Sequence, residues 1–150
     1  MQAETIKIIH LEPMRVARAW AFASNPEEQA WQKLAAFATP RGLLTAEHRI
    51  FGFNNPNPSA GSPNYGYEFW ITVDSEVTST AEVEIIEAPG GLYAVLHADV
   101  TGDYGVTIPA AWQRLDSWVA TSAYRHGAHQ WLEAHSPAGV PFAFYYPLAE

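Results

Sequence analysis

The pentapeptide Ala30-Trp31-Gln32-Lys33-Leu34 recurs, with the lysine replaced by arginine, as Ala111-Trp112-Gln113-Arg114-Leu115. The two copies are offset by 81 residues in a chain of 150, which places them at corresponding points of two halves. Self-similarity of this kind is expected when one structural unit has been duplicated and fused. We therefore predict internal repeats over about residues 1–78 and 79–150 that face each other across a cleft, and we expect function in that cleft.

Length and composition predict a single soluble domain over residues 1–150. The chain is long enough to bury a sizeable core but short for two independent domains, and its apolar fraction of 48% argues against disorder. No apolar run reaches the roughly 18 residues of a membrane span, and Met1-Gln2-Ala3-Glu4 lacks the pattern of a signal peptide. These features predict a cytoplasmic protein without a membrane partner.

Charge and cysteine content exclude several classes of function. The absence of cysteine excludes disulfides, thiolate chemistry and cysteine-ligated zinc. The spacing of His126, His129 and His135 matches no standard zinc pattern, so we predict no metal and no other cofactor. The 8 basic and 16 acidic residues give a formal net charge of −8, which leaves only a weak counterion-release term for nucleic acid. Direct nucleic-acid binding is therefore not expected, whereas cationic small molecules fit the sign of the charge.

In the first half, a helix between strands is indicated by its capping residues. Asn25 can cap the helix, Pro26 suits its first position, and Glu28 stands where a reciprocal capping bond forms. Gly42 is expected to end it. Its predicted buried stripe is Trp31, Leu34, Ala35 and Ala38. Alternation and β-branched or aromatic content predict strands over 4–9, 14–22, 47–53 and 65–73, with a breaker-rich loop over 54–64.

The second half repeats this order. A helix of about fifteen residues is expected after Gly105, with Thr107 as its cap and Pro109 in its first turn. Its predicted buried stripe is Trp112, Leu115 and Val119, and strands are predicted over 82–87, 92–100, 129–135 and 142–148. The fold class is therefore α+β: each half contributes a hairpin or strand, a helix and two strands, and a helix covers each antiparallel-rich sheet.

Period-two alternation along the strands separates a core face from a cleft face. In the strand over 65–73, the apolar face that should lie under the helix is formed by Tyr67, Phe69, Ile71 and Val73, which leaves Glu68, Trp70 and Thr72 on the opposite face. In the strand over 129–135, Gln130, Leu132 and Ala134 take one face, and His129, Trp131, Glu133 and His135 take the other. Each half thus offers a Trp–Glu pair on the face away from its helix. For Tyr93 and Tyr145, core and cleft positions are equally consistent with the pattern.

Several runs of the sequence resemble one family over nearly the whole chain. They are Gly52-Phe53-Asn54-Asn55-Pro56, Tyr65-Gly66-Tyr67-Glu68-Phe69-Trp70, Gly90-Gly91-Leu92-Tyr93-Ala94-Val95 and Ala111-Trp112-Gln113-Arg114-Leu115-Asp116-Ser117-Trp118. The chain resembles stand-alone GyrI-like proteins, which are related to the effector-binding domains of multidrug-responsive transcription regulators. The resemblance implies a pseudo-twofold, duplicated strand-helix-strand-strand fold around a ligand cleft with aromatic walls and a buried acid. It also implies binding of diverse lipophilic, often cationic, aromatic compounds.

The family resemblance also assigns an acid. Many relatives carry it in an aromatic-Glu-x-Tyr strand near the C-terminus, where this chain has His129-Gln130-Trp131-Leu132-Glu133, so the role falls to Glu133. No DNA-binding segment precedes the first strand, so a role in transcription would require a separate regulator chain; a homodimer is the other expected assembly. The expected ligand-binding residues are Phe53, Tyr67, Glu68, Trp70, Tyr93, Trp112, Trp131, Glu133 and Tyr145.

Three functions fit these residues. The first is binding and sequestration of planar lipophilic xenobiotics, in which indoles stack on the ligand and an acid attracts its cationic charge. The second is a hydrolase, because one GyrI-like subfamily opens the cyclopropyl group of DNA-alkylating antibiotics inside an aromatic cage. Glu133 would then be the general base, and the hydroxyl of Tyr145 or Tyr67 would donate to the substrate. The third is a protein–protein module of the gyrase-inhibitor type, in which the acidic surface acts.

Overall fold

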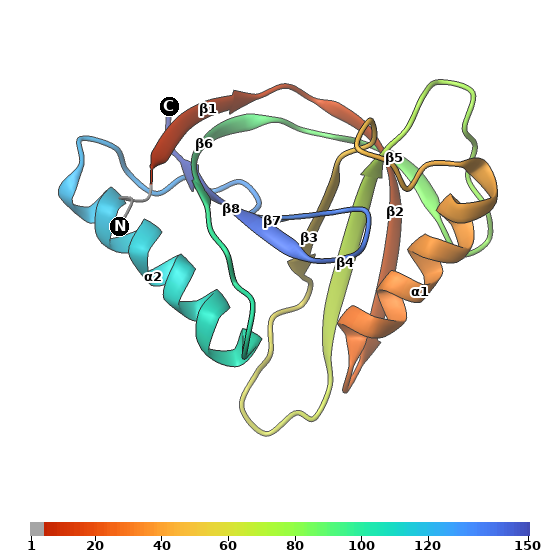
Figure 1. The fold of residues 1–150 in the computed structure, drawn as a ribbon, viewed down its shortest axis with the longest axis horizontal. Helices are drawn as coiled ribbons and strands as arrows, with labels where there is room; N and C mark the ends of the chain where they lie inside the picture. The colour runs from red at the N-terminus through yellow and green to blue at the C-terminus, as the bar shows by residue number, and fades with distance from the viewer. Residues whose placement is uncertain (1–4) are drawn as a thin grey trace. The chain divides into compact units, whose positions relative to one another are not determined.

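The computed structural model of the chain describes residues 5–150, so the predictions for Met1–Glu4 lie outside the described residues. Contacts divide the described chain into two compact units, which we name after their helices. The α1 unit comprises Met14–Ala88 and His135–Val140. The α2 unit comprises the described residues up to Pro13, then Pro89–Ala134 and Pro141–Glu150. Each unit contains one α-helix and antiparallel strands, which confirms the α+β class (Figure 1).

The α1 unit contains four strands in the hydrogen-bonded order β3-β4-β2-β5. Its elements are β2 (Met14–Ala23), α1 (Pro26–Ala38), the short 3₁₀ helix η1 (Thr39–Arg41), β3 (Ile50–Asn54), β4 (Tyr65–Thr72) and β5 (Glu84–Ala88). The four predicted strands of this region are present, with ends shifted by a few residues. The edge strand β5 pairs only with Met14–Arg18 of β2, so the remainder of β2 has no partner strand on that side among the described residues.

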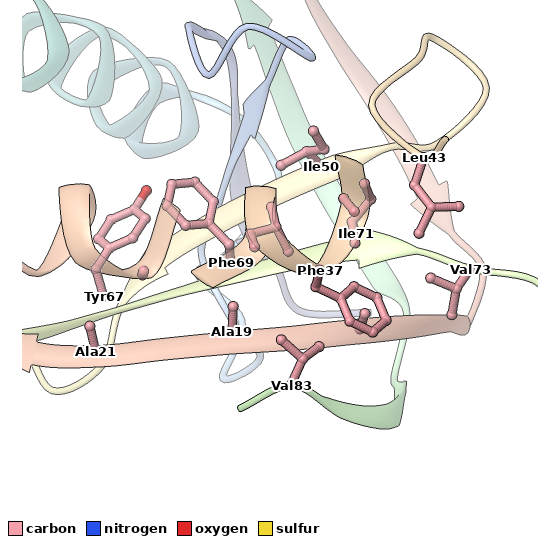
Figure 2. Packing of buried hydrophobic residues seen from close by; sticks show 14 residues of the cluster. Ala19, Ala21, Phe37, Leu43, Ile50, Tyr67, Phe69, Ile71, Val73 and Val83 are labelled. Carbon is pink, nitrogen blue, oxygen red and sulfur yellow. The ribbon is translucent and has the colours of Figure 1, made fainter. Parts of the chain in front are cut away.

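Helix α1 covers one face of this sheet. Ala30, Leu34, Phe37 and Ala38 are the buried apolar positions of the helix that join the core. They pack on Tyr67, Phe69, Ile71 and Val73 of the β4 region, as predicted, and on the small residues Ala17, Ala19 and Ala21 of β2 (Figure 2). The predicted stripe is therefore turned slightly, because Trp31 and Ala35 are only half-buried and Ala30 and Phe37 face the sheet instead.

The ends of α1 agree only in part with the predicted caps. Asn25 is the N-cap and Pro26 is the first helical residue, but the Asn25 side chain makes no bond to the helix backbone. Its Nδ2 donates to Glu28 Oε2 at 3.2 Å, and its Oδ1 accepts from Gln29 Nε2 at 2.9 Å. At the other end, Gly42 adopts a left-handed φ of 68° after η1, as expected of a helix stop.

The α2 unit contains four strands in the order β1-β6-β8-β7. Its elements are β1 (Ile6–Leu11), β6 (Gly91–His97), α2 (Tyr104–Thr121), β7 (Leu132–His135, whose last residue groups with the α1 unit) and β8 (Pro141–Leu148). Strand β7 is shorter than the predicted 129–135. The buried face of α2, Ala111, Leu115 and Val119, packs on Ala94 and Leu96 of β6 and on Phe144, Tyr146 and Leu148 of β8.

Helix α2 starts earlier than predicted. Asp103 is its N-cap and accepts a bond from Gly105 N at 3.0 Å, whereas the predicted cap, Thr107, lies within the helix. The Thr107 hydroxyl donates back to the carbonyl oxygens of Val100 and Asp103, at 2.8 and 3.1 Å. Pro109 is consequently inside the helix rather than in its first turn. An aspartate upstream of a glycine thus supplied the cap that we assigned to a threonine.

The two helices bury equivalent positions of the repeated pentapeptide. Ala30 and Leu34 in α1 and Ala111 and Leu115 in α2 are all completely buried, and Trp31 and Trp112 are half-buried beside them. The element order is also the same in both halves of the chain: two strands, a helix and two strands. None of the helices in the described part of the chain is long and apolar enough to cross a membrane.

Candidate functional site

An aromatic cluster lies against helix α2 in the α2 unit. Trp131, just before β7, packs edge-on against Trp112 of α2 with ring centroids 5.2 Å apart, and against Tyr146 of β8 at 4.5 Å. Phe144 and His126 complete what we call the α2 aromatic cluster: Trp112, His126, Trp131, Phe144 and Tyr146. These residues come from helix α2, strand β8 and the segment that connects α2 to β7, so the cluster is assembled by the fold of the unit.

Two carboxylates hold the polar ends of these rings. Glu133 of β7 accepts the indole N–H of Trp112 at 3.1 Å, and Asp116 of α2 accepts the hydroxyl of Tyr146 at 3.0 Å. Burial, then the hydrogen bond to Asp116 and the charge of that residue, raise the pKa of Tyr146 above its usual value, so the phenol remains the donor. The cluster thus combines flat apolar surfaces with two acids at its edges.

The cluster is open to solvent at two members, Trp131 and His126. Trp131 is 37% exposed, while Trp112 and Glu133 are half-buried and Tyr146 is buried. A large exposed indole that is already packed on three other rings can stack a planar ligand without first being ordered. An acid two residues along the chain from that indole places negative charge near such a ligand. The arrangement is therefore suited to binding a lipophilic cation.

The structure corrects the predicted face of β7. Trp131 and Glu133 were expected to lie away from the helix, but both contact Trp112 of α2 and so lie on the helix side. Leu132 and Ala134 are buried and take no part in the core beneath α2. Period-two alternation separated Trp131 and Glu133 from Leu132 and Ala134 correctly but exchanged their faces, because β6 and β8 already supply the apolar surface that α2 covers. The predicted position of His135 was also wrong, because its ring packs on Tyr67 and Phe69, which lie under α1.

The predicted pair Glu68 and Trp70 does lie away from its helix, in the α1 unit, but it is enclosed. Glu68 is only 3% exposed. Its Oε2 accepts from Arg18 Nε at 2.9 Å and Trp70 Nε1 at 2.7 Å, and its Oε1 accepts from Asn55 Nδ2 at 3.1 Å. Phe53 packs edge-on against Trp70 at 4.8 Å. Because the charge is paired with Arg18, this carboxylate serves the local structure of the α1 unit.

The predicted tyrosines lie in two other places. Tyr67 is buried in the core beneath α1. Tyr93 and Tyr145 pack edge-on at 5.6 Å in the α2 unit, and the Tyr93 hydroxyl donates to Gln130 O at 2.6 Å. Burial and the neighbouring Tyr145 raise the pKa of Tyr93 well above its usual value.

Tyr145 and Glu133 are not brought together. Phe144 and Tyr146 face α2, so their neighbour Tyr145 projects from the opposite face of β8, whereas Glu133 lies on the helix side. The structure therefore unites Trp112, Trp131 and Glu133 among the predicted site residues. Sequence analysis missed Tyr146, Asp116 and His126. The Phe144–Tyr146–Leu148 alternation contained the signal for Tyr146, had β8 been assigned to the face under α2.

Comparison with known proteins agrees with this description. A family model, the GyrI-like small molecule binding domain, matches residues 4–133, and the chain belongs to this family. Small-molecule binding is therefore its general function. Similar solved structures include the EcmrR C-terminal domain, at 13% identity and a TM-score of 0.72, with 99% of each chain covered. No curated protein sequence matched the chain significantly.

Two further solved structures share the fold. A hydrolase from Listeria innocua is 10% identical, with a TM-score of 0.69 over 99% of this chain and 94% of that one. An integron cassette protein from Vibrio cholerae is 15% identical, with a TM-score of 0.59 over 96% of this chain and 95% of that one. At these identities the likeness concerns the fold.

Proposed function

We propose that the α2 aromatic cluster binds planar, lipophilic, cationic aromatic molecules and sequesters them as xenobiotics. The observation that carries the proposal is the exposed Trp131, ordered by Trp112 and Tyr146 and accompanied by the carboxylate of Glu133. A cation over an indole face gains about 0.5–2 kcal/mol. The family's general function, small-molecule binding, supports the same conclusion.

The hydrogen bonds inside the cluster determine what the ligand can offer. The Trp112 N–H and the Tyr146 hydroxyl already donate to Glu133 and Asp116. A ligand acceptor would have to displace one of these charge-assisted bonds, which are roughly twice as strong as neutral ones. Recognition therefore rests on ring shape and positive charge rather than on hydrogen bonds from the ligand. Breadth of ligand follows from such recognition, because stacking tolerates many substituents.

A matched pair of ligands tests the proposal. N-methylquinolinium and quinoline have the same ring system, but only the first is charged at pH 7.5. Calorimetric titration should show tighter binding of the cation, and Glu133→Gln should reduce that preference while keeping an acceptor for Trp112. Glu87→Gln, which removes an exposed carboxylate of the α1 unit, is the control and should leave both affinities unchanged.

The aromatic contribution is tested separately. Trp131→Leu should weaken both ligands by about 2- to 30-fold, the range of a stacking or cation–π contact. The control is Trp118→Leu on α2, where the indole stacks on Tyr124; it should have no effect on the affinity for either ligand. Equal affinities for the two ligands in all variants would refute the site.

Mass spectrometry of the bound fraction distinguishes storage from turnover. Recovery of unchanged ligand supports sequestration. If a cyclopropyl-bearing electrophile is recovered with the added mass of one water molecule, the protein hydrolyses this compound rather than storing it. The separation of Tyr145 from Glu133 across β8 gives no support to that residue pair as catalyst. If no aromatic compound binds at all, a protein–protein role of the acidic surface replaces the small-molecule function.

A further inference from the structure

The free edge of β2 in the α1 unit is a second feature with binding capacity. Strand β5 pairs with β2 only as far as Arg18, opposite Glu84. The carbonyl oxygen of Trp20 accepts a bond from Lys33 Nζ at 3.0 Å, which shows that the backbone of Trp20 points to this edge. In an antiparallel sheet the N–H and C=O of one residue point to the same neighbour and alternate along the strand. Trp20 and Phe22 therefore direct their backbone groups to the open edge, and Ala21 directs its groups to β4.

Two exposed aromatic side chains accompany this edge. Trp20 is 38% and Phe22 is 49% exposed, and their rings stack at 6.4 Å with an interplanar angle of 19°. Both project from the face away from α1, since Ala19 and Ala21 are buried beneath that helix. The indole N–H of Trp20 donates to Asn55 O at 2.6 Å, which fixes the ring. A strand added to this edge would place alternate side chains beside this aromatic pair.

A pocket of about 510 Å³ lies at the same edge. It is lined by Arg18 and Trp20 of β2, Lys33 of α1 and the segment 79–84. A second pocket of about 720 Å³ shares Lys33, Thr80, Glu82 and Val83 with the first and continues along α1 past amide side chains of Asn25, Gln29 and Gln32. The two pockets thus form one groove between helix α1 and segment 79–84.

The charged side chains of the groove already have partners. Glu28 accepts from Asn25 Nδ2 at 3.2 Å, and Arg41 donates to Phe37 O at 2.7 Å. Lys33 lies 3.8 Å from Glu82, and Arg18 lies 2.9 Å from Glu68 and 3.8 Å from Glu84. A charged small molecule would therefore gain little net attraction. What the groove offers is backbone donors and acceptors, side-chain amides and a stacked aromatic pair. An uncharged polypeptide backbone in extended conformation uses all of these groups.

We propose that the β2 edge binds an extended peptide segment of a partner protein by strand addition, next to Trp20 and Phe22. Main-chain hydrogen bonds to an open edge supply affinity in this mode of recognition, and alternate side chains supply specificity. The groove favours a single strand over a second copy of the chain, because helix α1 and segment 79–84 line it on both sides. The Lys33 ammonium protects the edge while no peptide is present, a role that lysine takes at many edge strands.

The probe for this proposal is the blocked pentapeptide acetyl-Thr-Val-Thr-Tyr-Thr-amide, with its fully N-methylated analogue as control. The unmodified peptide should bind to ¹⁵N-labelled protein, shift the amide signals of Trp20 and Phe22 and slow their hydrogen exchange. The amide of Ala21, which points to β4, should change least. The N-methylated analogue cannot pair with an edge and should not bind; equal binding of the two peptides would overturn the proposal.

Two variants sharpen the test. Lys33→Met releases the Trp20 carbonyl and should tighten peptide binding at least threefold. Ala81→Trp fills the pocket from an exposed position and should abolish binding, while Ala120→Trp on the exposed side of α2 should not. If neither Lys33→Met nor Ala81→Trp changes the affinity for the peptide, the proposed peptide site at the β2 edge is refuted.

Competing occupants give different outcomes. If the amides of Trp20 and Phe22 become protected with rising protein concentration alone, and sedimentation shows a dimer, the edge binds a second copy and the peptide proposal fails. Because the α2 aromatic cluster and Glu133 lie in the α2 unit, Glu133→Gln should leave peptide binding unchanged. Loss of peptide binding in that variant would also count against an independent site.

Discussion

Replacement of Glu68 by leucine should destabilise the fold strongly. The carboxylate is 3% exposed and accepts three bonds, from Arg18, Trp70 and Asn55. Removing one partner of a buried ion pair costs about 3–5 kcal/mol, because the remaining charge and donors are left uncompensated. Arg18 can lower this cost, since its side chain is 32% exposed and already lies near Glu84. We therefore expect a loss near the lower limit, about 3 kcal/mol.

Urea denaturation measures this loss. With a slope of about 2 kcal/mol per molar urea, a loss of about 3 kcal/mol lowers the midpoint by about 1.5 M. Glu84→Leu is the control, because Glu84 is 65% exposed and its contact with Arg18 is 3.8 Å long. Exposed pairs contribute about 0–1 kcal/mol, so its midpoint should move by less than about 0.5 M.

A double variant separates charge pairing from packing. In Arg18→Met combined with Glu68→Leu, both ends of the ion pair are apolar, and part of the stability should return. The single and double variants form a cycle whose coupling energy reports the pair. If Glu68→Leu moves the midpoint no further than Glu84→Leu does, Glu68 is not the structural anion that its contacts indicate.

Three further predictions concern the local structure of each unit. Tyr65 donates to Glu27, and burial together with that bond raises the pKa of Tyr65 to about 12. The contribution of this phenol to stability should therefore be complete below about pH 10 and vanish as the pH rises to about 12. Alkaline denaturation of Tyr65→Phe should lack this component, and a profile identical to that of the unchanged protein would contradict the prediction. Gly42→Ala should cost about 1 kcal/mol in thermal unfolding, because φ is 68° there, and a neutral effect would contradict the left-handed assignment. Asp103→Ala should cost about 0.5–2 kcal/mol by loss of the α2 cap, whereas Thr107→Ala should cost less; the reverse order would favour the cap predicted from sequence.

The sequence predicted the class of the fold and the buried face of β4 because both depend on local periodicity. The repeated pentapeptide placed Leu34 and Leu115 at equivalent buried positions, and both are completely buried. Alternation in β4 correctly placed Tyr67 and Phe69 beneath α1. These features require only that apolar side chains recur with the period of a helix or a strand.

The face of β7 could not be predicted in the same way. Alternation separates Glu133 from Leu132 but does not say which of them faces α2, since this depends on how much apolar surface β6 and β8 already provide. The burial of Glu68 was also hidden, because two of its three donors, Arg18 and Asn55, come from other segments of the chain. The ligand-binding roles of the predicted residues remain predictions.

The way in which segments of the chain are shared between the two units has a consequence for protein engineering. Strand β1 belongs to the α2 unit and strand β5 to the α1 unit. The first strand of each half of the chain therefore pairs with a strand of the other half: β1 with β6, and β5 with β2. A cut between Thr78 and Ser79 would separate β6 from β1 and β2 from β5. Neither fragment should then fold alone, yet mixing the two should restore the protein, and this makes the chain a candidate for a split reporter whose halves are complementary rather than autonomous.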